Sequence, residues 1–266
     1  HLRNRRQRQM CIRDSANFYE RRIRRIFPAL AVVLAATVAA GLVLMLPGHT
    51  EALGRTAVAS TLFAANIFFW KTSDYFSPAA EQNPLLHTWS LAVEEQFYIF
   101  FPLLLVAIVR LREQWLIPLT VIGFIGSLAF CIWLTDYSRV AAFYLTPART
   151  WELLLGALLA YRPLPRLNST LNELVAATAV VGILVSVITF SERTEFPGFA
   201  ALVPCLATAA LIVSGAGSPT VVGRFLQWRP VVFVGLLSYS LYLWHWPIFV
   251  YLKYYLGAPK LPTDLA

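Results

Sequence analysis

Charged residues are scarce in this sequence, and their scarcity decides its class. Lys, Arg, Asp and Glu make up 14% of the 266 residues, whereas hydrophobic residues make up 58%. About a quarter of the residues in a soluble domain are charged. Helices that are apolar all round must be buried in a large protein or in lipid, and this chain is too short to bury many of them. The sequence therefore predicts an integral membrane protein.

The motifs that form disulfides and metal sites are also missing. The three cysteines form no C-x-x-C pair, and the four histidines are scattered without an H-E-x-x-H motif. We therefore expect neither a disulfide framework nor a metal site. No G-x-S-x-G motif occurs, which argues against a serine acyl-enzyme. Neither a repeat of fixed period nor a recurring strand pattern is visible.

Apolar windows fill most of the chain. Eight of them reach, or come close to, the length that a helix needs to cross a hydrocarbon core of about 30 Å, and three of the eight are short. We expect an all-α fold, a polytopic integral membrane helix bundle with about eight membrane segments in contact with lipid. The windows cover residues 26–46, 56–70, 96–109, 115–134, 140–161, 174–190, 199–213 and 231–252.

Basic residues are concentrated near the start of the chain. Of the 22 Lys and Arg residues, five lie in residues 1–15 and four more lie in residues 21–25. The net charge of +8 therefore does not indicate nucleic-acid binding, and a basic cluster beside a membrane helix is typical of cytoplasmic anchoring. We expect a non-native or disordered leader at 1–15, a membrane domain at 16–258 and a truncated tail at 259–266.

The stretch 83–101 combines one histidine and two adjacent carboxylates with an apolar run. Asn83 is a good N-cap and a proline follows it, so we expect a helix to begin there. On such a helix His87, Ser90 and Glu94 share one face. Ionisable groups at membrane depth are costly and usually functional, and a histidine with a carboxylate can move the proton that acyl transfer to an alcohol requires. The alternative is a helix start near the headgroups that keeps these groups wet.

Two later apolar windows also carry polar groups. Arg149 and Glu152 are three residues apart, so we expect them to pair on one helix face, either as a structural ion pair or as part of the site. Ser238, Tyr242 and His245 share a face of the last window, where His245 is either a site residue or a member of an aromatic belt.

These patterns define the candidate site residues. The four arginines in residues 21–25 form overlapping R-x-x-R pairs, which either anchor the chain or bind a multiply phosphorylated ligand through guanidinium forks. The candidate catalytic residues are His87, Glu94, Glu95, Arg149 and Glu152. The candidate cavity-lining residues are Trp89, Ser90, Tyr98, Ser238, Tyr242 and His245.

With these residues in place, the chain resembles the acyltransferase-3 family of bacterial membrane acyltransferases, which modify surface sugars. The stretch N-P-L-L-H-T-W-S-L-A-V-E-E-Q-F-Y at 83–98 is very specific. Three others support it: R-R-I-R-R-I-F-P-A-L at 21–30, R-T-W-E-L-L-L-G-A-L-L-A at 149–160 and L-S-Y-S-L-Y-L-W-H-W-P at 237–247. Their order spans nearly all of residues 17–255.

The resemblance implies transfer of an acetyl or other short acyl group from acyl-CoA to a hydroxyl of a lipid-linked or surface carbohydrate, at the bacterial inner (plasma) membrane. Acetyl-CoA is then a co-substrate, and no cofactor is bound permanently. In the family the arginine motif is associated with acyl-CoA, which maps onto Arg21, Arg22, Arg24 and Arg25.

The chain also departs from the family pattern. Family members begin with two further membrane helices, the first of which carries an arginine and a histidine thought to be catalytic, and neither helix is present. We therefore expect a piece of a longer protein that is inactive by itself. In that protein His87 is a partner of, or a substitute for, the family's histidine.

The resulting hypothesis requires distant polar side chains to converge on one chamber. His87, with Glu94 or Glu95, organises protons around the acyl group, while Arg149 with Glu152 shapes the cavity or stabilises the oxyanion. The chief rival is a transporter or flippase for a lipid-linked or acylated sugar, because intramembrane His, Glu and Arg also form proton relays. A non-catalytic assembly subunit is a third alternative.

Overall fold

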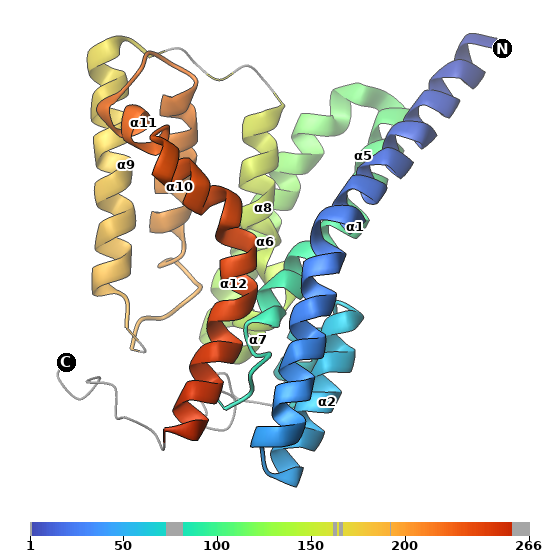
Figure 1. Cartoon of the computed structure of the whole chain (residues 1–266). Coiled ribbons are helices and arrows are strands. Elements are labelled where there is room, and N and C mark those ends of the chain that lie inside the picture. Colours follow the sequence, from blue (N-terminus) through green and yellow to red (C-terminus); the bar gives the residue numbers. More distant parts are fainter. Residues whose placement is uncertain (1, 73–81, 162–163, 165–166, 192, 257–266) are drawn as a thin grey trace. The chain divides into compact units, whose positions relative to one another are not determined.

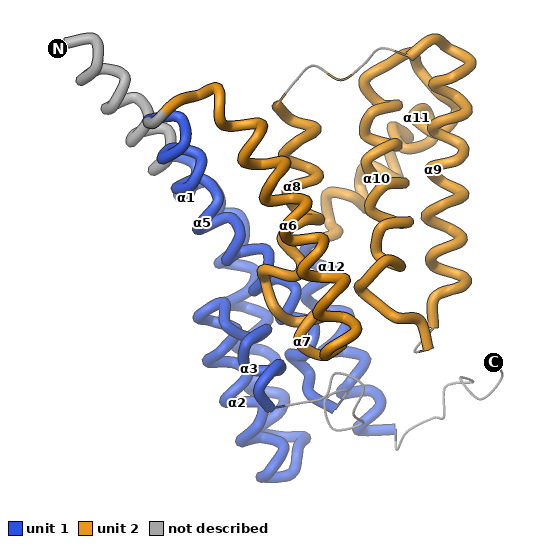
Figure 2. The backbone as a smooth tube through the Cα atoms, turned by 180° about the vertical axis from the view of Figure 1, so that it is seen from behind, with its two compact units in different colours: residues 1–111, 239–266 blue, residues 112–238 orange. Residues whose placement is uncertain are grey.

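The structure, a computed structural model, describes residues 2–72, 82–161, 164, 167–191 and 193–256, with side chains from residue 17 onward except that of Arg112. All regular secondary structure in these ranges is helical, which confirms the all-α class (Figure 1). The chain forms two compact units (Figure 2). Unit 1 comprises His1–Leu111 and Tyr239–Ala266, and unit 2 comprises Arg112–Ser238.

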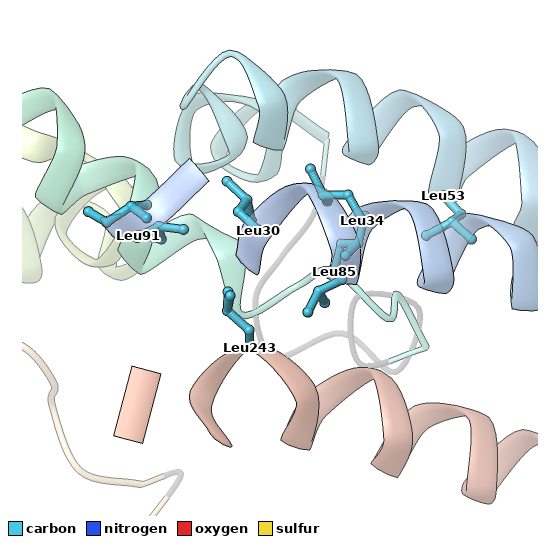
Figure 3. Packing of buried hydrophobic residues seen from close by; sticks show 8 residues of the cluster. Leu30, Leu34, Leu53, Leu85, Leu91 and Leu243 are labelled. Atoms are coloured by element: carbon cyan, nitrogen blue, oxygen red, sulfur yellow. The ribbon is translucent and has the colours of Figure 1, made fainter. Parts of the chain in front are cut away.

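Within the described residues, unit 1 contains four helices and the second half of a fifth. A cluster of buried side chains, mostly leucines, forms its core, with Leu30, Leu85 and Leu243 at most 1% exposed (Figure 3). Leu30 and Leu243 are more than two hundred residues apart, so this core joins an early helix of the chain to its last described helix. The helices are α1 (Leu2–Leu44), α2 (Pro47–Thr61), α3 (Ala65–Thr72), α5 (Thr88–Arg112) and α12 (Arg229–Tyr255).

Unit 2 contains the helices between α5 and α12. In it α6 packs against α8, and α9 packs against α10. Side-chain caps set three of the helix starts, because Ser138, Asn168 and Thr220 each accept a backbone N–H from the first turn. The helices are η1 (Glu113–Trp115), α6 (Leu116–Tyr137), α7 (Arg139–Tyr144), α8 (Thr146–Ala160), α9 (Ser169–Thr189), α10 (Leu202–Gly215) and α11 (Val221–Leu226).

Five of the eight apolar windows correspond to helices long and apolar enough to cross a membrane, within the described part of the chain. These candidate spans are Asn17–Leu44, Thr88–Arg110, Glu113–Tyr137, Ser169–Thr189 and Arg229–Tyr255. The other three windows behave differently. Window 56–70 is divided between α2 and α3, window 140–161 is divided between α7 and α8, and window 199–213 holds the short helix α10. The expected count of about eight is therefore not confirmed.

The domain boundaries expected at the two ends stay predictions. Helix α1 begins at Leu2, so its first turns lie within the expected leader 1–15, whose side chains are not described. The expected tail 259–266 lies outside the described residues.

Asn172 on α9 links that helix to the end of α10. It is fully buried, and its amide donates to the carbonyls of Ser214 at 3.0 Å and Ser218 at 2.6 Å. We expect Asn172→Leu to lower the free energy of unfolding by about 2 kcal/mol, because the buried Ser214 carbonyl loses its donor and the partly buried bond to Ser218 is lost as well. Thermal unfolding in detergent measures this. Thr178→Val on the exposed side of the same helix is the control, and an equal loss there would contradict the prediction.

Candidate functional site

Helix α5 begins later than the sequence predicts. Residues 83–88 form successive i→i+3 turns, and the α-helix starts at Thr88, so the expected start at Asn83 is wrong. The reason is local. The side-chain Oδ1 of Asn83 accepts the backbone N–H of Leu85 at 3.0 Å. The backbone carbonyl of Asn83 accepts the indole N–H of Trp246 at 2.9 Å. Because these bonds hold Asn83 in a turn, His87 lies just before the helix.

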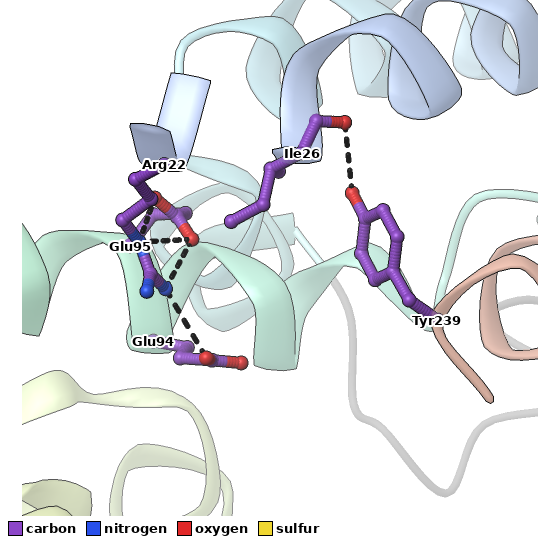
Figure 4. Close-up of polar contacts among 5 residues, drawn as sticks. All are labelled: Arg22, Ile26, Glu94, Glu95 and Tyr239. Atoms are coloured by element: carbon purple, nitrogen blue, oxygen red, sulfur yellow. Dashed lines mark hydrogen bonds and ion pairs between the residues drawn. The ribbon is translucent and has the colours of Figure 1, made fainter. Parts of the chain in front are cut away.

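Arg22 on α1 binds both carboxylates of α5 (Figure 4). Its Nε lies 3.0 Å from each oxygen of Glu95, and its Nη2 lies 2.6 Å from Glu95 Oε1 and 3.1 Å from Glu94 Oε1. The guanidinium carbon also lies 3.4 Å from the centre of the Tyr98 ring, a close cation–π contact. We call Arg22, Glu94, Glu95 and Tyr98 the arginine–glutamate cluster. It joins two apolar helices through charge inside unit 1.

His87 forms a second cluster with residues of α5 and α12. Its ring centre lies 5.2 Å from that of Tyr242 and 5.6 Å from that of His245. The Tyr242 hydroxyl donates to the His87 carbonyl and lies 2.7 Å from the Ser90 hydroxyl. We call His87, Ser90, Tyr242 and His245 the histidine cluster. The contact with His87 places His245 beside a candidate site residue, although its own side chain is exposed.

The imidazole of His87 is buried without satisfying its polar atoms. The residue is 8% exposed, and neither ring nitrogen makes a hydrogen bond of normal geometry to a residue that the structure describes. Burial, and secondarily the neighbouring His245, lower the pKa of His87 to about 3, although the Leu243 carbonyl opposes the shift. His87 is therefore neutral near pH 7, and its one donor and one acceptor are available to a further group as far as the described residues show.

Tyr239 on α12 lies between the two clusters and was not among the predicted residues. Its hydroxyl donates to the Ile26 carbonyl at 3.1 Å (Figure 4). Its phenol also interacts electrostatically with Glu94, Glu95 and Tyr242. The neighbouring Ser238, which the sequence analysis chose, is exposed and belongs to unit 2. The signal was present in the spacing, because Tyr239 precedes Tyr242 by three residues.

Arg149 and Glu152 pair as predicted, but in unit 2. Arg149 Nη2 lies 3.2 Å from Glu152 Oε2, and the guanidinium also lies over the rings of Phe143 and Phe196. Glu152 borders a pocket of about 230 Å³ between α8 and α10, together with Cys205. The predicted convergence of this pair with His87 and Glu94 stays a prediction.

The other predicted residues are exposed or partly exposed. Arg21, Arg24 and Arg25 are exposed on α1, and Arg24 pairs with Glu20 at 2.7 Å. Trp89 is partly buried on α5. No group of three or more His, Cys, Asp or Glu side chains within the described ranges is arranged to hold a metal ion.

The chain is similar to known proteins over most of its length. The profile of a family described as an acyltransferase domain matches residues 9–265. The chain is 29% identical to the O-acetyltransferase OatA of Staphylococcus aureus over 94% of its own length and 43% of that protein. It is 30% identical to YrhL of Bacillus subtilis, provisionally named a peptidoglycan O-acetyltransferase, over 89% and 40% of the two lengths.

A third relative is BcsY of Komagataeibacter xylinus, provisionally named a membrane-bound transacylase. The identity is 32%, over 90% of this chain and 60% of that protein. The chain thus spans less than two thirds of the curated relatives named here. No solved structure matches it significantly. These similarities and the five candidate spans establish a multi-pass integral membrane protein.

Proposed function

Because the chain belongs to the acyltransferase domain family that it matches over residues 9–265, we propose that it is the membrane part of an O-acyltransferase. The proposed reaction moves an acetyl or other short acyl group from acyl-CoA to a hydroxyl of a cell-surface or lipid-linked carbohydrate. Two of the relatives are named O-acetyltransferases, one of them for peptidoglycan, which supports a carbohydrate acceptor.

The chemistry needs one proton acceptor and a site that tolerates charge. The acceptor hydroxyl attacks the thioester carbonyl, its O–H proton passes to a base, and a C–O bond forms. The C–S bond then breaks, and the proton ends on the departing CoA sulfur, which leaves as the thiol. A positioned carboxylate within about 3 Å of the hydroxyl can serve as that base.

The arginine–glutamate cluster is the observation that carries this proposal. Three charged side chains meet on helices that are otherwise apolar enough to span a membrane, and such groups usually mark function. The Glu94 side chain is 47% exposed, whereas that of Glu95 is 8% exposed. We therefore assign proton transfer to Glu94.

His87 is given a different task, because distance separates it from Glu94. The two residues are seven positions apart, about 10 Å along a helix axis, so we assign them to different groups of the substrate. With a neutral ring whose nitrogens make no hydrogen bond of normal geometry within the described residues, His87 is suited to an uncharged polar group of a substrate, such as an amide or a hydroxyl. For Arg149 and Glu152 we keep the role given in the hypothesis, which is to shape a cavity or to stabilise the oxyanion.

The membrane arrangement is also part of the proposal. We propose the bacterial inner membrane, with the side that carries Arg21 and Arg25 in the cytoplasm, where acyl-CoA is available. We also propose about eight membrane segments, with the shorter helices α2, α3, α7, α8 and α10 completing those beyond the five candidate spans.

Labelled acetyl-CoA tests the proposed function directly. The full-length protein in detergent is expected to bind acetyl-CoA carrying a labelled acetyl group and to transfer the label to a glycan extract. Acetyl-CoA labelled only in its CoA part is the control, because it should bind without labelling glycan. A protein that neither binds nor transfers the label would remove the acyltransferase proposal. Movement of an unmodified lipid-linked sugar across the membrane of vesicles that contain the protein would favour the transporter hypothesis instead.

A further inference from the structure

Arg22 differs from Arg21, Arg24 and Arg25 in both burial and pairing. Its side chain is 18% exposed and its guanidinium forms four hydrogen bonds with carboxylates of α5. Arg21 and Arg25 are exposed, and Arg24 forms only a surface pair within α1. The sequence motif therefore contains one inward-facing residue and three outward-facing ones.

The net charge around Arg22 is wrong for a phosphate site. Two carboxylates and one guanidinium meet within 3.1 Å, which leaves a net charge of −1 if all three are ionised. A phosphate that approached Arg22 would be repelled by both carboxylates at short range. Arg21 and Arg25 lie four residues apart on one exposed face of α1, and no carboxylate pairs with either of them within the described residues.

We infer that Arg22 is a positioning residue for the two carboxylates of α5 and not a ligand of the acyl-CoA phosphates. This inference rests on the proposed function and divides the labour between the two glutamates. Glu95 is the anchor, because both of its oxygens are bound to Arg22. Glu94 gives one oxygen to Arg22 and keeps Oε2 without a partner among the described residues, so it is the carboxylate available to the reaction.

Helix geometry explains why one cation must hold both residues. Adjacent residues on a helix point about 100° apart, so a neighbouring side chain reaches both Glu94 and Glu95 only if it offers several donors in different directions. An arginine fork can reach both, whereas a lysine ammonium on its flexible stem cannot reproduce the fork. Arg22 therefore fixes the rotation of α5 about its own axis, and with it the direction in which Glu94 points.

The test compares Arg22→Lys with Arg25→Gln in the full-length protein. We expect Arg22→Lys to lower kcat at least tenfold while the Kd for labelled acetyl-CoA changes less than twofold. Arg25→Gln is expected to raise that Kd about tenfold, the loss of one charge-assisted contact. If Arg22→Lys raises the Kd as much as Arg25→Gln does, or leaves kcat unchanged, the inference is overturned.

Two further measurements keep the test decisive. If Arg22→Lys does not fold, the exchange of Arg22→Glu with Glu95→Arg is expected to restore folded protein and acetyl-CoA binding, with transfer still impaired. Loss of acetyl-CoA binding in that exchanged protein overturns the inference. The melting temperatures of Arg22→Ala, Glu95→Ala and the double variant should be non-additive. This melting-temperature measurement needs no acyl-CoA. A wild-type protein that binds no acyl-CoA would therefore contradict the proposed function, while the coupling of Arg22 to Glu95 could still be measured.

Discussion

Glu94→Gln is expected to reduce acyl transfer by about 10²- to 10⁴-fold, the range for loss of a general base. The amide keeps an oxygen for the bond to Arg22, which is 3.1 Å long in the native protein, but it cannot accept the hydroxyl proton. The charge of the cluster also changes from −1 to neutral, so folding should not suffer. Initial rates with labelled acetyl-CoA measure the effect, and size-exclusion profiles in detergent report on folding.

Glu95→Gln is the matched comparison, because the two glutamates are neighbours in the sequence. An amide at 95 directs an NH2 group at the Nε or Nη2 of Arg22, so we expect a lower melting temperature and less folded protein. Activity per folded molecule should fall less than in Glu94→Gln. If both variants lose activity equally while remaining fully folded, the division between anchor and base is wrong.

His87→Phe is expected to lower kcat/KM about 10- to 100-fold without lowering stability at neutral pH. The ring nitrogens of His87 make no normal hydrogen bond to the described residues, so an apolar ring of similar shape removes an unsatisfied polar group. A substrate that used one donor and one acceptor of the imidazole would lose both. His49→Phe is the control, because His49 also has a buried ring nitrogen with no hydrogen bond to the described residues and is not a candidate site residue.

The same variant has a signature in pH. Because burial lowers the pKa of His87 to about 3, the unfolded chain binds a proton near pH 6.5 that the folded chain refuses. Stability is therefore retained above pH 6.5 and lost as the pH falls towards 3, by roughly 2 kcal/mol at pH 5. Because Phe carries no titratable group, His87→Phe should gain stability relative to wild type as the pH falls over this interval. A constant difference between pH 7 and pH 5 would contradict the assignment of a buried neutral imidazole.

Local features of the fold followed from the sequence. Arg149 and Glu152 lie three residues apart on one helix, so their pairing needs only helix geometry. The five long spans likewise follow from length and hydropathy. The expected start of α5 at Asn83 failed because a tertiary contact from Trp246, 163 residues away, accompanies the competing turn.

Features that depend on long-range packing did not follow. Arg22 and Glu95 are 73 residues apart, and R-x-x-R spacing does not reveal which arginine faces a neighbouring helix. The choice of Ser238 over Tyr239 has a similar cause. Helix α12 carries apolar side chains on all of its faces, so its sequence pattern does not fix which face packs against α1. The contact between His87 and His245 was likewise visible only in three dimensions.

The turn before α5 determines the rotation of that helix about its own axis. Asn83 is held by Trp246, and its amide donates to Thr56 on α2 at 2.8 Å, so this turn is tied to two other helices. Inserting or deleting one residue between Asn83 and Thr88 would rotate α5 by about 100° and carry Glu95 away from Arg22. Natural variants of this protein should therefore tolerate substitutions in that segment far better than any change in its length.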